Sequence, residues 1–291
     1  MNYGPFTFTS YPCALCGSVG RSVVMHKAAV IVDRTFEIVR CDDCGHHYVD
    51  PRIADDELGQ LYDDQYYRAG GFDTSTNYFA PASDYTRRVA NDVVDTIASS
   101  LDRPLRGARC LDIGCGPGHL LEALHAGGAD AFGFDDSDAA MRICAERDLE
   151  TVSQRELDGL AGTFDVVTAI EVIEHVPKPD EFLRFLASLL RIGGVAYVQT
   201  GNWNTVKLVT GTPYVMPEGH IHYFTPPEMR GLFRRCGLRE SKAFNRSWFP
   251  YRDGPAFIRT AIPIDVLAVA GRAAQLTMTG YAPFPVGIRV S

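Results

Sequence analysis

"CLDIGCGPGHL", residues 110–120, is the stretch that decides the fold. An apolar run ends at Asp112, and Gly114, Gly116 and Gly118 follow at every second position. The next residues, 119–128, have the apolar spacing of a helix and end in two glycines. A glycine-rich loop between a strand and a helix suits a nucleotide-like ligand, because the N-terminus of the helix offers free N–H groups. The stretch therefore predicts such a site after the first strand of an α/β fold.

The segments that follow alternate between strand and helix patterns as far as about residue 238. The predicted strands are 131–135 (AFGFD), 164–172 (FDVVTAIEV) and 195–200 (VAYVQT). The predicted helices are 137–148, with Ser137 as N-cap, 180–194, and one that begins near Thr225. Such alternation predicts a parallel sheet covered by helices on both faces.

Composition divides the rest of the chain. Residues 1–54 are turn-rich and contain a predicted hairpin at 28–41, with strands at VIV and FEIV. Residues 55–105 have helical periodicity and read as a linker or lid. We expect the ligand-binding α/β domain at 106–245, and 246–291 as a C-terminal extension without an assigned role.

The glycine spacing narrows the ligand. A dinucleotide site prefers G-x-G-x-x-G, but His119 occupies the third glycine position, so an NAD-dependent oxidoreductase is the weaker alternative. The Asp112 carboxylate would bind an ammonium group more favourably than a pyrophosphate. S-adenosylmethionine carries such an ammonium group. Asp135, at the end of the second strand, can accept both ribose hydroxyls. A non-catalytic adenosine- or zinc-binding protein stays open as a second alternative.

These motifs resemble those of the class I S-adenosylmethionine-dependent methyltransferases. The resemblance covers residues 106–238 through LDIGCGPG, GFDDS, FDVVTAIEVIEHV and LLRIGGVAYVQT. It implies a doubly wound, Rossmann-like sheet of seven mostly parallel strands whose last strand is antiparallel. It also implies that Asp112 and the loop 114–118 hold the methionine part, and that Asp135 holds the ribose. The full set of expected cofactor contacts is Asp112, Gly114, Cys115, Gly116, Gly118, Asp135, Asp136, Gln154, Ile170 and Glu171, with the adenine contact at Gln154 or Glu156.

Four of the eight cysteines form two C-x-x-C pairs near the N-terminus. They are Cys13, Cys16, Cys41 and Cys44, and Gly17 and Gly45 follow the two pairs. Two intervening residues let both thiolates of a pair reach one tetrahedral ion, and the glycines suit a tight turn. The pattern predicts a closed, structural zinc site in a ribbon-like module. Two disulfides or four unrelated thiols are the alternatives, and His46 and His47 are possible replacement ligands.

The methyl acceptor is predicted from a second resemblance, and the catalytic base is predicted from three histidines. The two C-x-x-C-G pairs, followed by HHYVDPR (46–52) and YDDQYY (62–67), resemble the pattern of methyltransferases from sugar, polysaccharide and natural-product pathways. The resemblance implies a small-molecule acceptor, such as a hydroxyl of a sugar, glycan precursor or natural product. Pro217 and Gly219 depart from the pattern of deoxysugar C-methyltransferases and favour O-methylation, with C-methylation of a deoxysugar as the alternative. His175 follows the fourth strand, and His220 and His222 share one face of an extended segment. His220 matches the catalytic base of zinc-containing deoxysugar C-methyltransferases, although Pro217 and Gly219 replace the tyrosine and glutamate of that family.

Charge and hydropathy exclude two partner classes. The 291 residues carry a net charge of −8, and residues 1–54 have no basic excess, so we expect no nucleic-acid partner. No apolar run reaches 18 residues, which predicts no membrane span. The first residues, MNYGPFTFTS, do not resemble a signal peptide, and the expected location is the cytoplasm.

Overall fold

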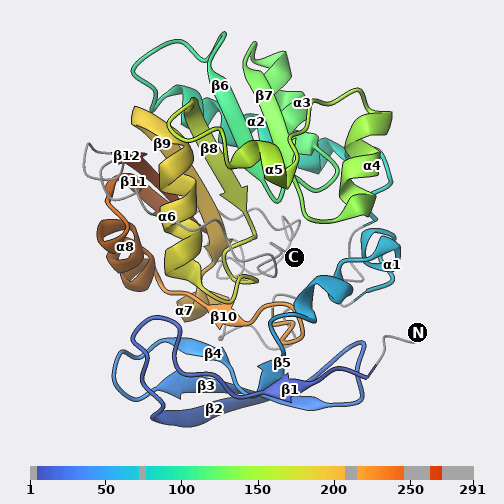
Figure 1. Cartoon of the computed structure of the whole chain (residues 1–291), viewed down its shortest axis with the longest axis vertical. Helices are drawn as coiled ribbons and strands as arrows, with labels where there is room; N and C mark the ends of the chain where they lie inside the picture. Colours follow the sequence, from blue (N-terminus) through green and yellow to red (C-terminus); the bar gives the residue numbers. More distant parts are fainter. Residues whose placement is uncertain (1–4, 72–76, 207–214, 246–262, 271–291) are drawn as a thin grey trace.

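The computed structural model describes residues 5–71, 77–206, 215–245 and 263–270, and its centre is a six-stranded sheet (Figure 1). The strand order is β11-β12-β9-β8-β6-β7. Strands β6 to β9 are parallel, and β12 lies antiparallel between β9 and β11. The strands are β6 (Arg109–Ile113), β7 (Asp130–Phe134), β8 (Phe164–Ile170), β9 (Leu190–Gly201), β11 (Leu238–Asn245) and β12 (Pro263–Ala270).

The predicted fold class is confirmed. A parallel bridge between Gly133 and Thr151 extends the sheet beyond β7, at the place of a seventh strand. The predicted antiparallel last strand is β12, which lies beyond residue 245, where the sequence had placed the domain boundary. PIDVLAVA is a short apolar run that pairs with both β9 and β11, so the central sheet includes residues beyond 245.

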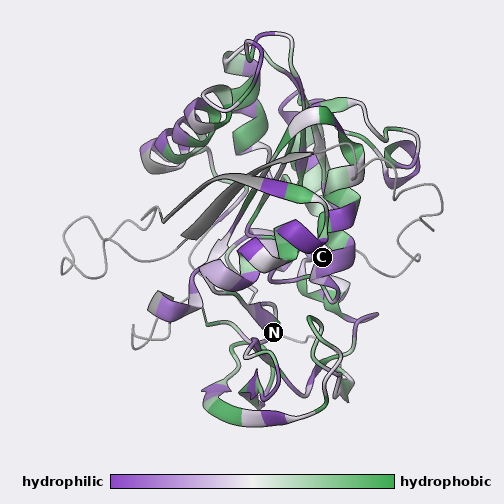
Figure 2. Cartoon of the chain, turned by 90° about the vertical axis from the view of Figure 1, so that its left-hand side faces the viewer, coloured by the Kyte–Doolittle hydropathy of each residue, from purple (hydrophilic) through white to green (hydrophobic). Residues whose placement is uncertain are grey.

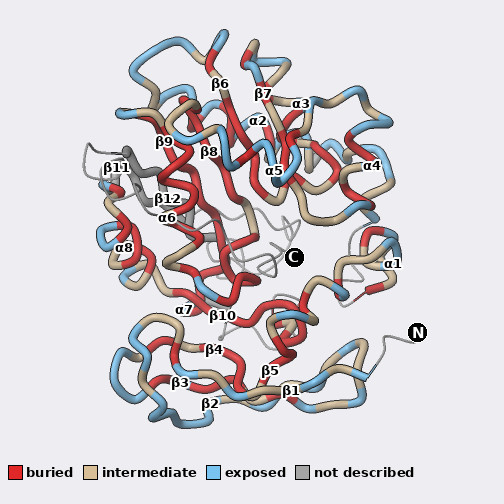
Figure 3. Tube along the Cα trace, in the orientation of Figure 1, coloured by how far each residue is buried: buried red, intermediate tan, exposed pale blue. Residues whose placement is uncertain are grey.

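Helices cover both faces of the sheet. One buried cluster packs α6 and α8 against it, and another packs α2 and α3 against the opposite face. Hydrophobic and hydrophilic residues share the same helices in Figure 2, and Figure 3 shows the central strands buried. The helices are η1 (Leu58–Leu61), α1 (Asp64–Tyr67), α2 (Asp84–Ala98), α3 (His119–Ala126), α4 (Asp138–Glu146), α5 (Gln154–Leu157), α6 (Pro179–Leu189), α7 (Trp203–Val206) and α8 (Pro226–Arg235). Helix α6 ends at Leu189 rather than near residue 194, because β9 begins at Leu190.

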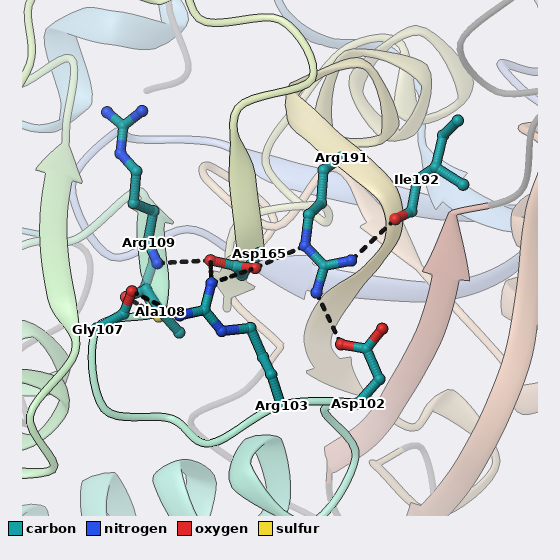
Figure 4. Close-up of polar contacts among 9 residues, drawn as sticks. Asp102, Arg103, Gly107, Ala108, Arg109, Asp165, Arg191 and Ile192 are labelled. Carbon is teal, nitrogen blue, oxygen red and sulfur yellow. Dashed lines mark hydrogen bonds and ion pairs between the residues drawn. The ribbon is translucent and has the colours of Figure 1, made fainter.

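An ion-pair network fixes the amino end of β8, away from the carboxyl ends of the strands (Figure 4). The buried Asp165 carboxylate accepts from Arg191 Nε at 2.6 Å and from the Arg109 backbone N–H at 2.8 Å. Arg103 lies 3.3 Å from it, and Arg191 also binds Asp102 at 2.7 Å. Burial raises the pKa of Asp165, but these donors outweigh it and hold the pKa below its usual range.

The N-terminal segment forms two small sheets that join the α/β domain through one strand. Strand β1 (Phe8–Thr9) pairs with β5 (Arg52–Ile53), and the second sheet has the order β10-β4-β3-β2. Its strands are β2 (Arg21–Ala28), β3 (Thr35–Cys41), β4 (His47–Val49) and β10 (His222–Tyr223). The predicted VIV strand is wrong, since residues 30–32 lie in the connection and β2 precedes them. Figure 1 shows the N-terminal strands (blue) at the end of the central sheet toward which β8 points.

Helices long and apolar enough to cross a membrane are absent from the described part of the chain.

Candidate functional site

The glycine loop leaves β6 at its carboxyl end and turns into α3. Gly114, Gly116 and Gly118 have φ values of +72°, +51° and +82°, a backbone conformation that residues with a side chain rarely adopt. A Cβ on Gly114 would lie 2.4 Å from Val172 Cγ2, whereas a Cβ on Gly116 would meet nothing within 4 Å. The loop therefore packs against the residues that follow β8 and leaves open space at Gly116, where a ligand can approach the backbone.

Asp135 is held beside this loop. Its carboxylate accepts from the backbone N–H groups of Gly116 and Ser137, both at 2.9 Å, and from the Tyr67 hydroxyl at 3.4 Å. Burial raises the pKa of Asp135. The position at the carboxyl end of β7, next to open space at Gly116, is compatible with the predicted ribose contact.

Asp112 is only 4% exposed and lies at the carboxyl end of β6. The Thr168 hydroxyl donates to it at 2.5 Å. Burial raises the pKa of Asp112 to about 7, and the nearby Asp135 charge adds to that effect. A buried acid of this kind gains from a cationic partner.

The other predicted cofactor residues lie around the same ends of the strands. Cys115 is buried with its Sγ 4.0 Å from Cys144 Sγ, so it supports the loop from behind. Gln154 is exposed at the start of α5, and Asp136 is partly buried after β7. Ile170 ends β8, and Glu171 follows it with φ +53°. Gln199 Nε2 donates to the Glu171 carboxylate at 3.2 Å.

A group of tyrosines, which we did not predict as site residues, lies beside Asp135 and His175. The Tyr62 hydroxyl lies 2.7 Å from His175 Nδ1, and the Ser137 hydroxyl donates to the Tyr62 carbonyl at 3.0 Å. Tyr66 stacks on Tyr78 with ring centroids 5.7 Å apart. Burial raises the pKa of Tyr62, Tyr66 and Tyr67 well above the usual range, so these rings are neutral. The aromatic run YDDQYY is the signal that could have indicated them.

Two of the predicted histidines meet in one cluster. His175 and His220 have ring centroids 4.7 Å apart. One possible metal-ligand atom from each of these rings and one carboxylate oxygen of Glu174 all lie within 4.8 Å of one another. All three side chains are buried. His175 Nδ1 lies 3.0 Å from the Gly219 carbonyl oxygen. The sequence indicates Ile170, Glu171 and His175 in IEVIEHV, but it gives no separate signal for Glu174.

His222 belongs to a different place. His220 lies just after a turn at 217–219, whereas His222 lies in β10, so the expected shared face is wrong. His222 Nδ1 is 3.0 Å from His46 Nε2, and His46 Nδ1 is 3.0 Å from the Glu228 carboxylate. His46 is fully buried in this seam rather than at the surface. His222 thus joins the N-terminal strands to α8.

The four N-terminal cysteines converge. Cys13 Sγ and Cys44 Sγ are 3.5 Å apart, Cys16 Sγ and Cys41 Sγ are 3.6 Å apart, and all four lie within 4.8 Å of one another. Thiolates at 2.3 Å from a tetrahedral ion are about 3.8 Å apart. Gly17 N–H donates to the Cys13 carbonyl at 2.8 Å, and Gly45 N–H to the Cys41 carbonyl at 3.0 Å, so both turns have the same form. The thiols fit one tetrahedral metal ion.

The sheet order, the glycine loop and the acid after the second strand define an α/β domain of the methyltransferase class. A family profile described as "Methyltransferase domain" matches residues 85–240, and the chain belongs to that family. The prediction of an S-adenosylmethionine-dependent methyltransferase is thereby confirmed at the level of the family.

The relatives sharpen this result. The chain is 34% identical over 155 residues to a ubiquinone biosynthesis O-methyltransferase of Bordetella avium, covering 47% of the chain and 64% of that protein. It is 35% identical to the enzyme of the same name from Ralstonia nicotianae, covering 48% of the chain and 66% of that protein. The chain thus spans slightly less than two thirds of each. In fold it is similar to magnesium protoporphyrin IX methyltransferase of Synechocystis, with a TM-score of 0.54, 18% identity, and coverage of 75% of the chain and all of that protein.

These relatives correct the predicted acceptor. We expected a hydroxyl of a sugar, glycan precursor or natural product, with a deoxysugar C-methyltransferase as the alternative. The curated relatives carry the name of a ubiquinone-pathway O-methyltransferase instead. The motif around His220 suggested the deoxysugar alternative. A histidine in such a segment fixes where a polar group lies, but it does not determine the shape of the acceptor.

Proposed function

We propose that the protein transfers the methyl group of S-adenosylmethionine to a hydroxyl oxygen of a small aromatic acceptor. The relatives are named O-methyltransferases of ubiquinone biosynthesis, which supports a hydroxyl compound related to quinones. The Tyr62 ring meets the His175 ring edge to face at 5.7 Å, and Tyr66 packs against Tyr62 at 4.9 Å. Such rings favour an aromatic acceptor beside the cluster.

In this proposal the cofactor lies along the carboxyl ends of β6, β7 and β8. Asp112 faces the ammonium group, the backbone of 114–118 holds the methionine part, and Asp135 accepts from the ribose hydroxyls. Gln154 and Asp136 border the adenine, and Ile170 and Glu171 border the methyl group. The carboxylates of Asp112 and Glu171 offset the positive charges of the ammonium and sulfonium groups.

The observation that carries the proposal is the buried cluster of Glu174, His175 and His220. Glu174 and His175 follow Glu171 within four residues, and Val172 between them lies against Gly114. The acceptor hydroxyl gives its proton to this cluster, with His220 as the predicted base. The oxygen then bonds to the methyl carbon, the carbon–sulfur bond breaks, and its electron pair stays on the neutral thioether. Alignment at close range supplies much of the rate.

The cysteine cluster is proposed to hold one structural zinc ion. Four thiolates close the coordination sphere, so the ion would have no open position for chemistry. A cytoplasmic location is part of this proposal, because cysteines stay reduced and available to a metal ion in a reducing compartment. The division into a zinc module at 1–54 and a lid at 55–105 is part of the same proposal, as is the lack of a nucleic-acid partner.

The test measures S-adenosylhomocysteine formed from S-adenosylmethionine with a panel of phenols and catechols. We expect turnover that falls ~10²–10⁴-fold in His220→Ala, because the acceptor's proton then lacks its receiving group. Cofactor affinity should stay near wild type by titration calorimetry. His26→Ala, at an exposed histidine of β2, is the control. Methylation of nitrogen or carbon acceptors alone would overturn the proposal, and an unimpaired His220→Ala would remove His220 from it.

A further inference from the structure

Glu174, His175 and His220 bring two imidazoles and one carboxylate to one buried point. One ligand atom from each lies within 4.8 Å of the others. Metal–ligand bonds to such atoms are about 2.0–2.2 Å long, which places tetrahedral ligand atoms about 3.4 Å apart, so atoms at the 4.8 Å limit would have to approach one another by about 1.4 Å to hold an ion. Glu174 is fully buried, and the two histidines are at most 6% exposed. Two imidazoles with one carboxylate are a ligand set that binds zinc or iron and keeps open positions.

Neighbouring groups orient these side chains. His175 Nδ1 lies 3.0 Å from the Gly219 carbonyl oxygen and 2.7 Å from the Tyr62 hydroxyl, and these two contacts fix the position of the ring. Backbone N–H groups of Ile221 and His222 donate to the Glu174 carbonyl at 3.0 and 3.1 Å. A backbone carbonyl behind a histidine is the usual support of a metal ligand.

The surrounding charge calls for a cation. Glu174 is fully buried and Glu171 lies three residues before it, so two acidic side chains lie close together in the chain at this point, and a cation beside them would offset their charge. Glu171 holds this place with φ +53°, a backbone conformation that costs energy for a residue with a side chain. A divalent ion would allow both carboxyl groups to stay ionised.

We propose that the cluster of Glu174, His175 and His220 is a binding site for a divalent transition-metal ion, distinct from the cysteine cluster. The role of this ion rests on the proposed function. An ion here binds the acceptor oxygen and lowers the pKa of its hydroxyl. His220 then acts as a ligand, and the hydroxyl proton passes to the Glu171 carboxylate before the oxygen attacks the methyl carbon.

The test titrates Mn²⁺ into the full-length protein, purified with its zinc, and follows free Mn²⁺ by electron paramagnetic resonance. Mn²⁺ suits oxygen and nitrogen ligands and leaves a thiolate site alone. We expect about one Mn²⁺ per chain, with binding weakened at least ~100-fold in Glu174→Gln and in His220→Gln. His222→Gln, two residues from His220 but outside the cluster, is the matched control and should bind as wild type. Retained S-adenosylmethionine affinity shows that each variant is folded.

The inference is overturned if wild type binds no Mn²⁺, or if both cluster variants bind it as tightly as wild type does. Methyl transfer that continues in protein treated with a mild chelator, without bound Mn²⁺, would leave the proposed function intact and remove the metal. Mn²⁺ that binds at the cluster without methyl transfer to any hydroxyl would keep the metal site and remove the proposed function.

Discussion

The four-cysteine cluster and the cluster of Glu174, His175 and His220 both bring together side chains that can bind a metal, but they differ in how their residues are spaced along the sequence. Each cysteine pair is one local turn with its own glycine, and two such turns meet. The second cluster joins a loop after β8 to a turn some 45 residues later. The first is closed by four thiols, whereas the second has three ligands beside the ends of the strands. The difference fits the two proposals, in which the cysteine cluster stabilises the fold and the other cluster takes part in the chemistry.

The largest expected effect is that of Cys41→Ser. A closed thiolate site contributes its binding free energy to folding, roughly 10–16 kcal/mol in zinc-finger peptides. We expect wild type to hold one zinc ion per chain in metal analysis, and Cys41→Ser to lose both the ion and the ordered N-terminal sheets, as followed by circular dichroism.

Glu174→Gln is the matched variant in the other cluster and should keep the zinc and the melting temperature within a few degrees. The comparison breaks if Cys41→Ser is metal-free and still melts like wild type in reducing buffer.

The same contrast explains what the sequence could predict. C-x-x-C-G spacing and the G-x-G-x-G loop are local, so the cysteine cluster and the cofactor loop were found from the residues alone. The meeting of His175 with His220, and the separation of His220 from His222, depend on the turn at 217–219. Alternation gave the wrong face because only residues 222–223 are extended as a strand. Strand β12 was missed because a short apolar run fits a helix or a strand until its partners are known.

A second prediction uses Asp112, the buried acid at the far end of the proposed cofactor site. Its raised pKa, about 7, means that half of the folded protein carries a neutral Asp112 at neutral pH. The cofactor's ammonium needs the ionised form, so S-adenosylmethionine affinity should rise about tenfold from pH 6 to pH 8. Asp112→Asn should bind weakly and show a flat profile by titration calorimetry.

Stability should change in the opposite direction. The folded chain keeps the Asp112 proton that the unfolded chain releases near its usual pKa of 3.8, so stability falls as pH rises from about 4 to 7. Asp112→Asn should therefore melt higher than wild type at pH 8, with no such gain at pH 4. Equal pH dependence in both proteins would show that Asp112 is already ionised and that another group, such as Asp135, controls cofactor binding.

The smallest expected effect lies at His46, which connects the two regions. His46 follows the second cysteine turn, and its ring contacts both His222 and Glu228 at 3.0 Å. His222 in turn donates its backbone N–H to the Glu174 carbonyl. His46→Gln can replace one of the two ring contacts, so we expect a loss of about 1–3 kcal/mol in unfolding free energy. Turnover should fall several-fold at unchanged S-adenosylmethionine affinity, because Glu174 loses part of its support.

Zinc content should stay at wild-type level, since the four thiols complete the ion's coordination without His46. His26→Gln, on the exposed strand β2, is the control for loss of a histidine in the same sheet. Loss of zinc in His46→Gln would assign His46 to the metal site. A turnover equal to that of His26→Gln, together with the expected loss of stability, would show that the seam only holds the two regions together. A lower turnover with the zinc retained would show that the zinc module helps to position the chemical cluster across β4 and β10.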